Sequence, residues 1–217
     1  MCDGVLIVFE GVEGAGKTTQ IRELYQWLLT SSRCQALDRS IVLTREPGGT
    51  SLGVRLRQLL LEQQTDECIQ DRSELLLYAA DRAQHVEAFI KPHLRNGAIV
   101  LCDRYTDSTI AYQGYGRGLD LQLIEQVNQL ATGGLVSDLT FWLEIDVKVG
   151  LSRARQRGSA DRIEQAELMF HQRVDAGYRQ LAQQHPDRIV RIDAQGNVDE
   201  VFQQVKLAWQ QRFPEFC

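Results

Sequence analysis

The sequence lacks the features that mark secreted, membrane-spanning and metal-clustering proteins. No apolar run approaches the roughly 18 residues that span a bilayer, and the first residues show no basic, apolar and small-residue signal pattern. The five cysteines are scattered and form no C-x-x-C pair, so we expect reduced thiols in a cytoplasmic protein. The four histidines lack the spacing of metal ligands. A net charge of −5 indicates neither a nucleic-acid nor a membrane partner.

Nothing in the 217 residues divides the chain, since there is no linker, internal repeat or low-complexity tract. A hydrophobic fraction of 43% is ordinary for a globular protein, and this length is enough to bury one core. We therefore expect a single domain over residues 1–217.

Short apolar runs alternate along the chain with segments of helical periodicity. We expect strands at residues 5–9, 40–44, 99–103, 139–145 and 189–192. We expect helices at residues 17–30, 52–61, 73–95, 121–130, 147–157, 166–184 and 198–212. Five apolar strands separated by helices predict an α/β fold with a five-stranded, mostly parallel sheet and helices on both faces. Such sheets bind ligands beyond the carboxyl ends of their strands.

The most informative segment is residues 11–18, which match the phosphate-binding P-loop pattern G-x-x-x-x-G-K-[ST]. It lies between a predicted strand and a predicted helix, and the N-terminus of that helix adds its own attraction for phosphate. We expect Lys17 to reach the β- and γ-phosphates and the Thr18 hydroxyl to bind Mg²⁺. The predicted ATP-binding residues are Gly11, Val12, Glu13, Gly14, Ala15, Gly16, Lys17, Thr18 and Thr19.

A second phosphate-handling element is predicted at residues 99–103, an apolar run closed by Asp103 in the Walker-B pattern. An aspartate that closes a strand is often only a cap or a turn, but beside a P-loop it predicts a second group that organises Mg²⁺. Arg104 follows, and its guanidinium suits a phosphate with two hydrogen bonds, with a structural ion pair as the alternative. Two anion sites, one with magnesium, indicate a kinase acting between two phosphorylated molecules. No N-K-x-D guanine motif is present, which weakens the interpretation as a GTP switch.

Three further segments carry side chains that suit an acceptor molecule. Arg45 and Pro47 follow the second predicted strand, where a Gly-Gly turn allows close approach of the backbone. Tyr78 and Arg82 share a helical face, so a ring and a guanidinium can hold a nucleobase there. A core tyrosine beside a snorkelling arginine is the alternative. The third segment carries polar side chains for a pocket around the acceptor: Ser108, Thr109, Tyr112 and Gln113. Helix capping and solvated surface are the alternatives for these residues.

Three arginines end the helix predicted at residues 147–157. Arg153 and Arg157 share one face, while Arg155 points away from it. A following Gly-Ser pair allows a hinge, so residues 153–163 are predicted to form a mobile lid whose arginines stabilise the transferring phosphoryl group. A basic helix end that complements its dipole is the alternative. The P-loop supports the lid because Lys17 is its only cation, and the predicted catalytic residues are Lys17, Arg104, Arg153 and Arg157.

Together these motifs resemble those of thymidylate kinases of the bacterial type. The resemblance covers nearly the whole chain and rests on residues 9–19, 45–50, 81–82, 103–105, 111–114 and 161–164. It implies the P-loop nucleoside monophosphate kinase fold and transfer of the ATP γ-phosphate to dTMP with Mg²⁺, giving dTDP for dTTP synthesis, in a cytoplasmic homodimer. A kinase for dUMP, UMP/CMP or AMP, and a non-catalytic nucleotide-binding regulator, are the alternatives.

The resemblance also implies roles for single residues. Arg45 and Arg104 match positions that handle the dTMP phosphate. Tyr78 matches the aromatic residue stacked on thymine, and Arg82 matches the arginine that bonds the edge of the base. Tyr78 departs from the phenylalanine common at this position and should stack equally well.

Further roles concern the sugar and the lid. Glu13 matches an acidic position near the deoxyribose 3′-hydroxyl, and Tyr112 matches a residue packed against the sugar. The resemblance favours the subtype whose lid, rather than its P-loop, supplies the arginines. For the dimer face we take the leucine-rich helical region of residues 66–95, since its leucines exceed what one sheet face needs.

Overall fold

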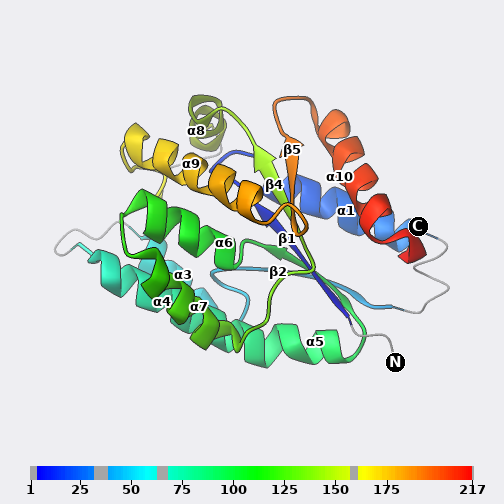
Figure 1. The fold of residues 1–217 in the computed structure, drawn as a ribbon, viewed down its shortest axis with the longest axis horizontal. Coiled ribbons are helices and arrows are strands. Elements are labelled where there is room, and N and C mark those ends of the chain that lie inside the picture. Colours follow the sequence, from blue (N-terminus) through cyan, green and yellow to red (C-terminus); the bar gives the residue numbers. More distant parts are fainter. Residues whose placement is uncertain (1–3, 32–38, 63–67, 157–160, 217) are drawn as a thin grey trace.

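The computed structural model describes residues 4–31, 39–62, 68–156 and 161–216 (Figure 1). Its strands form one sheet in the order β2-β3-β1-β4-β5, and every pairing is parallel. The predicted five-stranded sheet is therefore confirmed. The strands are β1 (Val5–Glu10), β2 (Ile41–Arg45), β3 (Ile99–Asp103), β4 (Leu139–Glu144) and β5 (Ile189–Asp193).

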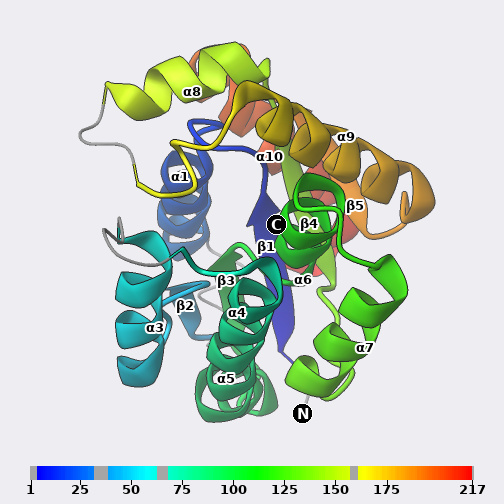
Figure 2. The same cartoon turned by 90° about the vertical axis from the view of Figure 1, so that its left-hand side faces the viewer.

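Helices cover both faces of this sheet, as Figures 1 and 2 show. Within the described part of the chain, no helix is both long and apolar enough to cross a membrane. The helices are α1 (Lys17–Thr30), α3 (Ser51–Leu61), α4 (Asp71–His85), η1 (Val86–Ile90), α5 (Lys91–Arg95), α6 (Thr106–Thr109), η2 (Ile110–Gly116), α7 (Leu121–Thr132), α8 (Val147–Arg155), α9 (Leu168–Gln184), α10 (Val198–Arg212) and η3 (Pro214–Phe216).

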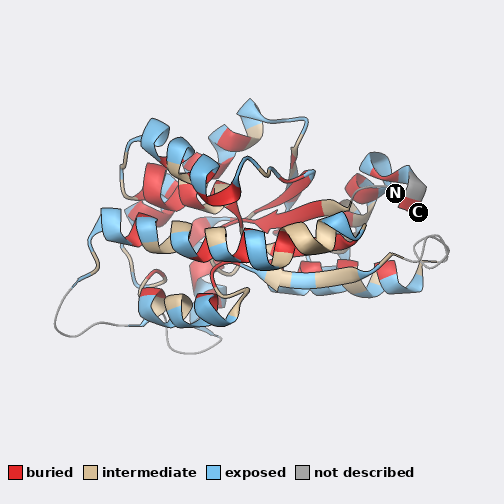
Figure 3. Cartoon of the chain, turned by 90° about the horizontal axis from the view of Figure 1, so that it is seen from below, coloured by how far each residue is buried: buried red, intermediate tan, exposed pale blue. Residues whose placement is uncertain are grey.

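Successive side chains of the central strands enter two different cores, because side chains alternate between the faces of a sheet. Ile7 and Phe9 of β1 pack with residues of α1, α9 and α10. Leu6 and Val8 pack on the other face with η1 and β3. All four side chains are fully buried, which explains why the strand is a continuous apolar run rather than an alternating one. Figure 3 shows the buried strands between helices whose outer sides are exposed.

One helical segment was missing from the sequence prediction. α6 and η2 run without interruption from Thr106 to Gly116, in a stretch for which we predicted polar contacts to an acceptor molecule but no helix. Polar and apolar side chains are buried together here, Tyr112 and Gln113 among them. A polar side chain inside the protein removes the amphipathic stripe on which helix prediction depends.

The helix predicted at residues 73–95 is continuous but changes its winding. A π-helical turn, η1, comes directly before α5, whose second residue is Pro92. Proline lacks an N–H and clashes with the carbonyl of the preceding turn, and a wider turn accommodates both defects. The helix therefore passes through a residue that normally ends one.

Candidate active site

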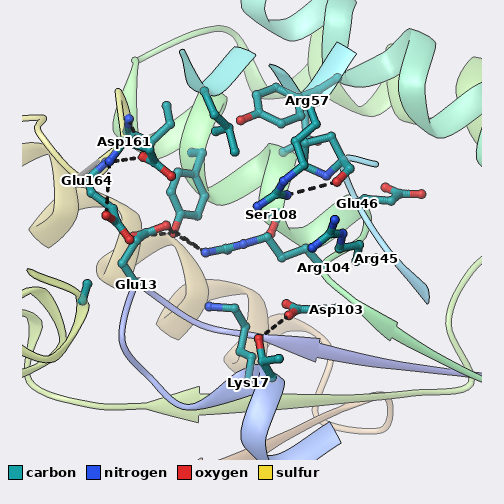
Figure 4. A pocket seen from close by; sticks show the side chains of 18 of the residues that line it. Glu13, Lys17, Arg45, Glu46, Arg57, Asp103, Arg104, Ser108, Asp161 and Glu164 are labelled. Carbon is teal, nitrogen blue, oxygen red and sulfur yellow. Dashed lines mark hydrogen bonds and ion pairs between the residues drawn. The ribbon is translucent and has the colours of Figure 1, made fainter. Parts of the chain in front are cut away.

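A cleft of about 430 Å³ lies beyond the carboxyl ends of β1, β2 and β3 (Figure 4). This is the edge of the sheet at which parallel α/β proteins bind ligands. Most of the side chains predicted from the sequence meet there. Those that line the cleft are Glu13, Gly14, Gly16, Lys17, Thr18, Thr19, Arg45, Pro47, Tyr78, Arg82, Asp103, Arg104, Ser108, Thr109, Tyr112 and Gln113.

Other predicted residues do not line this cleft. Gly11, Val12 and Ala15 are buried within the P-loop itself. Arg153 is exposed on α8, and its Nη1 donates to the carbonyl oxygen of Ala194 at 3.3 Å. Arg157 lies outside the described residues, as does part of the predicted lid.

The P-loop holds its lysine through its own backbone. Lys17 Nζ donates to the carbonyl oxygens of Gly11 and Val12, each at 2.9 Å. Burial, and then the positive charge of Arg104, lower the pKa of Lys17 to about 8. The ammonium is thus confined at the N-terminus of α1, where a bound phosphate would meet it.

The P-loop also packs directly against α8. A Cβ built on Gly14, whose φ is +72°, would lie 1.9 Å from the carbonyl oxygen of Gly150. A Cβ on Gly150 would lie 2.5 Å from the carbonyl oxygen of Glu13. Neither position accepts a side chain, so the helix that leads to the predicted lid is in backbone contact with the phosphate loop.

Thr18 and Asp103 meet at the base of the cleft. Thr18 Oγ1 donates to Asp103 Oδ2 at 3.1 Å, across 85 residues of sequence. No group of three or more histidine, cysteine, aspartate or glutamate side chains that could hold a metal occurs among the described residues. One hydroxyl and one carboxylate suit Mg²⁺, which keeps several waters and takes its other ligands from substrate phosphates.

Arg104 is held in a conformation that few side chains adopt. Its φ is +71°, and it is the one non-glycine with positive φ in the described part of the chain. Its Nη2 donates to Glu13 Oε1 at 2.8 Å and to the Tyr112 hydroxyl at 3.0 Å. Its Nη1 donates to Ser108 Oγ and to the Tyr178 hydroxyl, both at 3.2 Å. Such backbone strain persists only where the surroundings fix it, and it is concentrated at functional sites.

A buried carboxylate beneath Arg104, Glu10, was not among the predicted site residues. It is fully buried and accepts from Ser108 Oγ at 2.6 Å, the Tyr178 hydroxyl at 2.7 Å and the Tyr105 N–H at 2.8 Å. Burial raises the pKa of Glu10, with the charge of Arg104 acting against it. Glu10 therefore fixes two of the four groups that hold Arg104.

Glu13 faces the same guanidinium from the P-loop. Burial alone would raise its pKa, but the charge of Arg104, His171, Lys17 and the Tyr112 hydroxyl together outweigh burial, so that the pKa of Glu13 is lowered. The Tyr112 hydroxyl donates to both carboxylate oxygens, at 2.7 and 2.8 Å. Glu13 is thus ionised and aimed into the cleft beside Arg104 (Figure 4).

Tyr78 and Arg82, which were predicted to share a helical face, both line the cleft from α4. Arg82 does not snorkel to solvent, since it is 2% exposed. Its Nε donates to Glu46 Oε2 at 2.7 Å, and its Nη2 donates to the carbonyl oxygen of Tyr105 at 2.9 Å. Its Nη1 donates to Thr109 Oγ1 at 2.7 Å and to Asn128 Oδ1 at 2.9 Å.

A fourth arginine lines the cleft beside Arg45, Arg82 and Arg104. This residue, Arg57 on α3, was not predicted from the sequence. Its Nη1 donates to the carbonyl oxygen of Pro47 at 3.0 Å, and burial and then the charge of Arg45 lower its pKa. Figure 4 shows Arg45, Arg57 and Arg104 above Lys17 and Asp103. The pattern of an amphipathic helix predicts that an arginine such as Arg57 faces solvent, so nothing in the sequence indicated its place in the cleft. The other lining residues that were not predicted as site residues are Glu46, Leu61, Ala154, Asp161, Ile163 and Glu164. Three of them, Ala154, Asp161 and Ile163, belong to the predicted lid.

The described C-terminal end of the predicted lid, residues 161–163, borders the cleft and attaches to α4. Arg162 Nη2 pairs with Glu74 Oε2 at 2.5 Å, and its Nε donates to the carbonyl oxygen of Leu60 at 2.8 Å. Glu74 is fully buried and also accepts from Gln113 Nε2 at 2.8 Å. Gln113, which we predicted as an acceptor contact, is therefore oriented by the same carboxylate that anchors this segment.

Comparisons with known proteins give a single answer. The sequence profile of the family described as thymidylate kinase matches residues 9–205. A thymidylate kinase of Trichodesmium erythraeum is 58% identical over 221 residues, which cover 98% of each chain. A thymidylate kinase of Nostoc punctiforme is 57% identical over 94% of each chain. A crystal structure of thymidylate kinase from Ehrlichia chaffeensis superposes with a TM-score of 0.78 at 34% identity, over 96% of this chain and 100% of that one.

Proposed function

The chain belongs to the thymidylate kinase family, and on that premise we propose how this cleft phosphorylates dTMP with ATP. Family membership selects dTMP kinase over the other monophosphate kinases and the regulator that the sequence alone left open. The observation that carries the assignment of roles is that the P-loop lysine and the strained Arg104 line one cleft.

On the donor side, Lys17 and the P-loop N–H groups bind the ATP phosphates. Lys17 Nζ now donates to carbonyl oxygens of its own loop, which sets the ammonium where the β- and γ-phosphates arrive. Glu13 does not bind the phosphates with its side chain, because it is an anion. Its place is with Arg104 and with the sugar of the acceptor.

On the acceptor side, Arg45, Arg57 and Arg104 hold the dTMP phosphate. A phosphate oxygen of dTMP attacks the γ-phosphorus in line, and the bond from that phosphorus to the ADP oxygen breaks. Tyr78 stacks on the base, Arg82 and Thr109 face its edge, and Ser108, Tyr112 and Gln113 enclose the sugar. Positioning and charge neutralisation do the catalytic work, without a covalent enzyme intermediate.

The residues at the base of the cleft fit Mg²⁺. Thr18 and Asp103 would hold the ion directly or through water, as their contact at 3.1 Å suggests. When bound, Mg²⁺ neutralises charge on the phosphates. Asp103 and Arg104, neighbours in the sequence, serve different partners, because β3 ends at Asp103 and the backbone turns at Arg104, whose φ is +71°.

We propose that the chain is one kinase domain whose residues 153–163 close over the nucleotides and supply an arginine. In support, α8 makes backbone contact with the P-loop through Gly150. Single alanine variants at Arg153, Arg155 and Arg157 would identify the residue, because removing the arginine that stabilises the transition state costs about 10³–10⁵ in kcat. The other two variants should keep kcat within about threefold.

The homodimer stays a proposal. To the face predicted at residues 66–95, of which 66–67 lie outside the described residues, we add α3, which lies beside α4 in Figure 2. Leu76 on α4 is 62% exposed, and α3 exposes Leu52, Val54 and Leu59. A Leu76→Arg variant should convert a dimer to a monomer in light scattering coupled to gel filtration. A monomeric wild-type protein would reject the proposal.

Of the cysteines, Cys68 and Cys102 are free thiols, and the cytoplasmic location stays a prediction.

The test of the proposed roles is a coupled ADP-release assay with ATP and Mg²⁺, run with dTMP beside dUMP, UMP, CMP, AMP and dGMP. We expect strong turnover of dTMP and weaker turnover of dUMP, which lacks the thymine methyl group. Preference for another monophosphate would discard the roles of Tyr78 and Arg82 while keeping the P-loop chemistry.

A further inference from the structure

Behind the acceptor side of the cleft lies a histidine that the proposed mechanism does not use. His85, at the C-terminal end of α4, is fully buried. Its Nδ1 lies 2.9 Å from Glu46 Oε1, and its Nε2 lies 2.6 Å from Thr44 Oγ1. Both ring nitrogens are therefore hydrogen-bonded to residues about 40 positions earlier in the sequence: Nε2 to Thr44 in β2, and Nδ1 to Glu46 directly after β2.

Glu46 fixes the role of one ring nitrogen. An ionised carboxylate only accepts hydrogen bonds, so Nδ1 carries a proton and donates to Glu46. A hydroxyl both donates and accepts, so Thr44 satisfies Nε2 whether or not that nitrogen carries a proton.

Glu46 transmits this constraint to the cleft. The second carboxylate oxygen of Glu46, Oε2, accepts a hydrogen bond from Arg82 Nε at 2.7 Å. The Glu46 residue is 4% exposed. A guanidinium has five N–H groups, and four of those of Arg82 are used by Glu46, Thr109, Asn128 and the Tyr105 carbonyl. Within the described residues one Nη2–H is left, on a side chain that lines the cleft. The direction of that N–H depends on where Glu46 holds the guanidinium plane.

His85 also shapes the turn that carries Arg45 and Pro47. A Cβ built on Gly49 would lie 2.4 Å from His85 Nε2 and 2.5 Å from its Cδ2. The imidazole thus fills the space in which a side chain at position 49 would stand. The His85 ring therefore determines both the path of the turn and the position of the Glu46 carboxylate.

We propose that His85 is a positioning residue for the acceptor base, acting through Glu46 on Arg82. It touches neither nucleotide, and its effect is on dTMP binding and on the choice of base rather than on phosphoryl transfer. This inference rests on the proposed role of Arg82.

The test compares two substitutions, each of which keeps one of the two hydrogen bonds that the imidazole makes. The amide nitrogen of His85→Asn occupies the place of Nδ1 and retains the donation to Glu46. The amide of His85→Gln reaches toward Thr44 and abandons Glu46. The measurements are kcat and KM for dTMP and for dUMP, the Kd for ATP and the Tm of each variant.

We expect His85→Gln to raise the KM for dTMP about tenfold, as the loss of one hydrogen bond to a charged group implies. Its kcat and its Kd for ATP should stay within about twofold, and its preference for dTMP over dUMP should fall. His85→Asn should keep KM within about threefold. The matched controls are the same two substitutions at His93 on α5, whose ring bonds the carbonyl of Phe89 in its own helix, and they should change nothing.

Equal effects of Asn and Gln, or parallel losses in kcat, KM and ATP binding, would assign His85 to stability alone and overturn the inference. If both variants fail to fold, Thr44→Val tests the same ring, because loss of that hydroxyl frees the imidazole to turn. It should raise the KM for dTMP about threefold, and an unchanged KM would reject the inference. An inactive wild-type enzyme in the monophosphate panel would instead reject the proposed function.

Discussion

The donor loop (residues 11–18) bonds its lysine within itself, whereas the acceptor wall (Arg45, Glu46, Tyr78, Arg82 and Arg104) is joined by contacts between distant segments. Lys17 reaches carbonyls five and six residues away. Arg82 reaches groups 23 to 46 residues away, and Arg104 reaches the P-loop and α9 at 91 and 74 residues. The two halves of one cleft are thus built at different ranges along the chain.

The two halves also differ in how charge is handled. The donor loop holds a cation at a helix N-terminus, and burial, followed by the positive charge of Arg104, lowers the pKa of Lys17 despite three nearby carboxylates. The acceptor wall pairs each buried cation with a carboxylate, Arg82 with Glu46 and Arg104 with Glu13. We infer that a substitution in the loop should affect catalysis with little loss of stability, whereas one in the wall should affect both.

The largest effect should come from Lys17→Ala. It removes the charge that meets the γ-phosphate, so kcat should fall about a thousandfold or more. The Kd for dTMP and the Tm should change little, because no other element depends on this side chain for its contacts. Steady-state kinetics and calorimetry measure both, and Lys91→Ala on α5, at a residue that does not line the cleft, is the control. A fall in Tm as large as that of a core mutant would break the comparison.

Arg82→Ala should behave in the opposite way. It leaves Glu46 buried without its ion pair, which costs about 3–5 kcal/mol of unfolding free energy. The KM for dTMP should rise and the choice of base should loosen as well. Urea unfolding of this variant beside Tyr78→Ala separates the two effects, since Tyr78 makes no ion pair and should lower dTMP affinity with a smaller loss of stability. Unchanged stability in Arg82→Ala would contradict the account of the wall.

Arg104→Met probes the one place where the two halves meet. Loss of the guanidinium should raise the KM for dTMP about a hundredfold, because a phosphate contact is lost and Glu13 remains as an unpaired carboxylate. In combination with Glu13→Gln, the effects on stability should be non-additive by about 1–3 kcal/mol. Strictly additive stabilities would show that the loop and the wall are energetically independent. Arg179→Met, at an exposed ion pair, is the control.

The smallest effect concerns Asp81, a buried carboxyl whose Oδ1 accepts from the Gly48 N–H at 3.1 Å. Burial, and then the charge of Glu46, raise the pKa of Asp81 to about 6. The folded protein therefore binds more protons than the unfolded chain between about pH 4 and 6, and this group's contribution to stability is lost as pH rises through that window.

Asp81→Asn should consequently stabilise the protein at pH 7–8 by about 1 kcal/mol, since the amide keeps the acceptor for Gly48 and carries no charge. The advantage over wild type should grow from pH 4 to 6 and then level off. Unfolding free energies measured across this range test the window. A constant difference between the two proteins would show that Asp81 does not titrate there.

The contrast between loop and wall explains which parts of the site the sequence predicted. The P-loop and Asp103 follow from short patterns because their chemistry is local to one strand end. Tyr78 and Arg82 were predicted to share a helical face, which spacing alone determines. That Arg82 would be buried against Glu46 was not predictable, because the partner comes from another segment.

The site residues and the helix that the sequence did not predict owe their positions to packing between distant segments, which leaves no local sequence pattern. Arg57 looked like a solvent-facing arginine of an amphipathic helix, and the segment from Thr106 to Gly116 showed no stripe. Glu10 stood at the end of an apolar strand with nothing to mark it as the anchor of Ser108 and Tyr178. Each of these residues has a function only because a distant element lies against it.

By itself, the sequence determined the alternation of strands and helices, the parallel sheet and the phosphate loop, because hydrophobic period and glycine spacing act within a few residues. The tertiary structure alone decided the strand order, the strained conformation of Arg104 and the buried chain from His85 through Glu46 to Arg82. A buried charge needs a partner, and no local pattern indicates which distant segment supplies it.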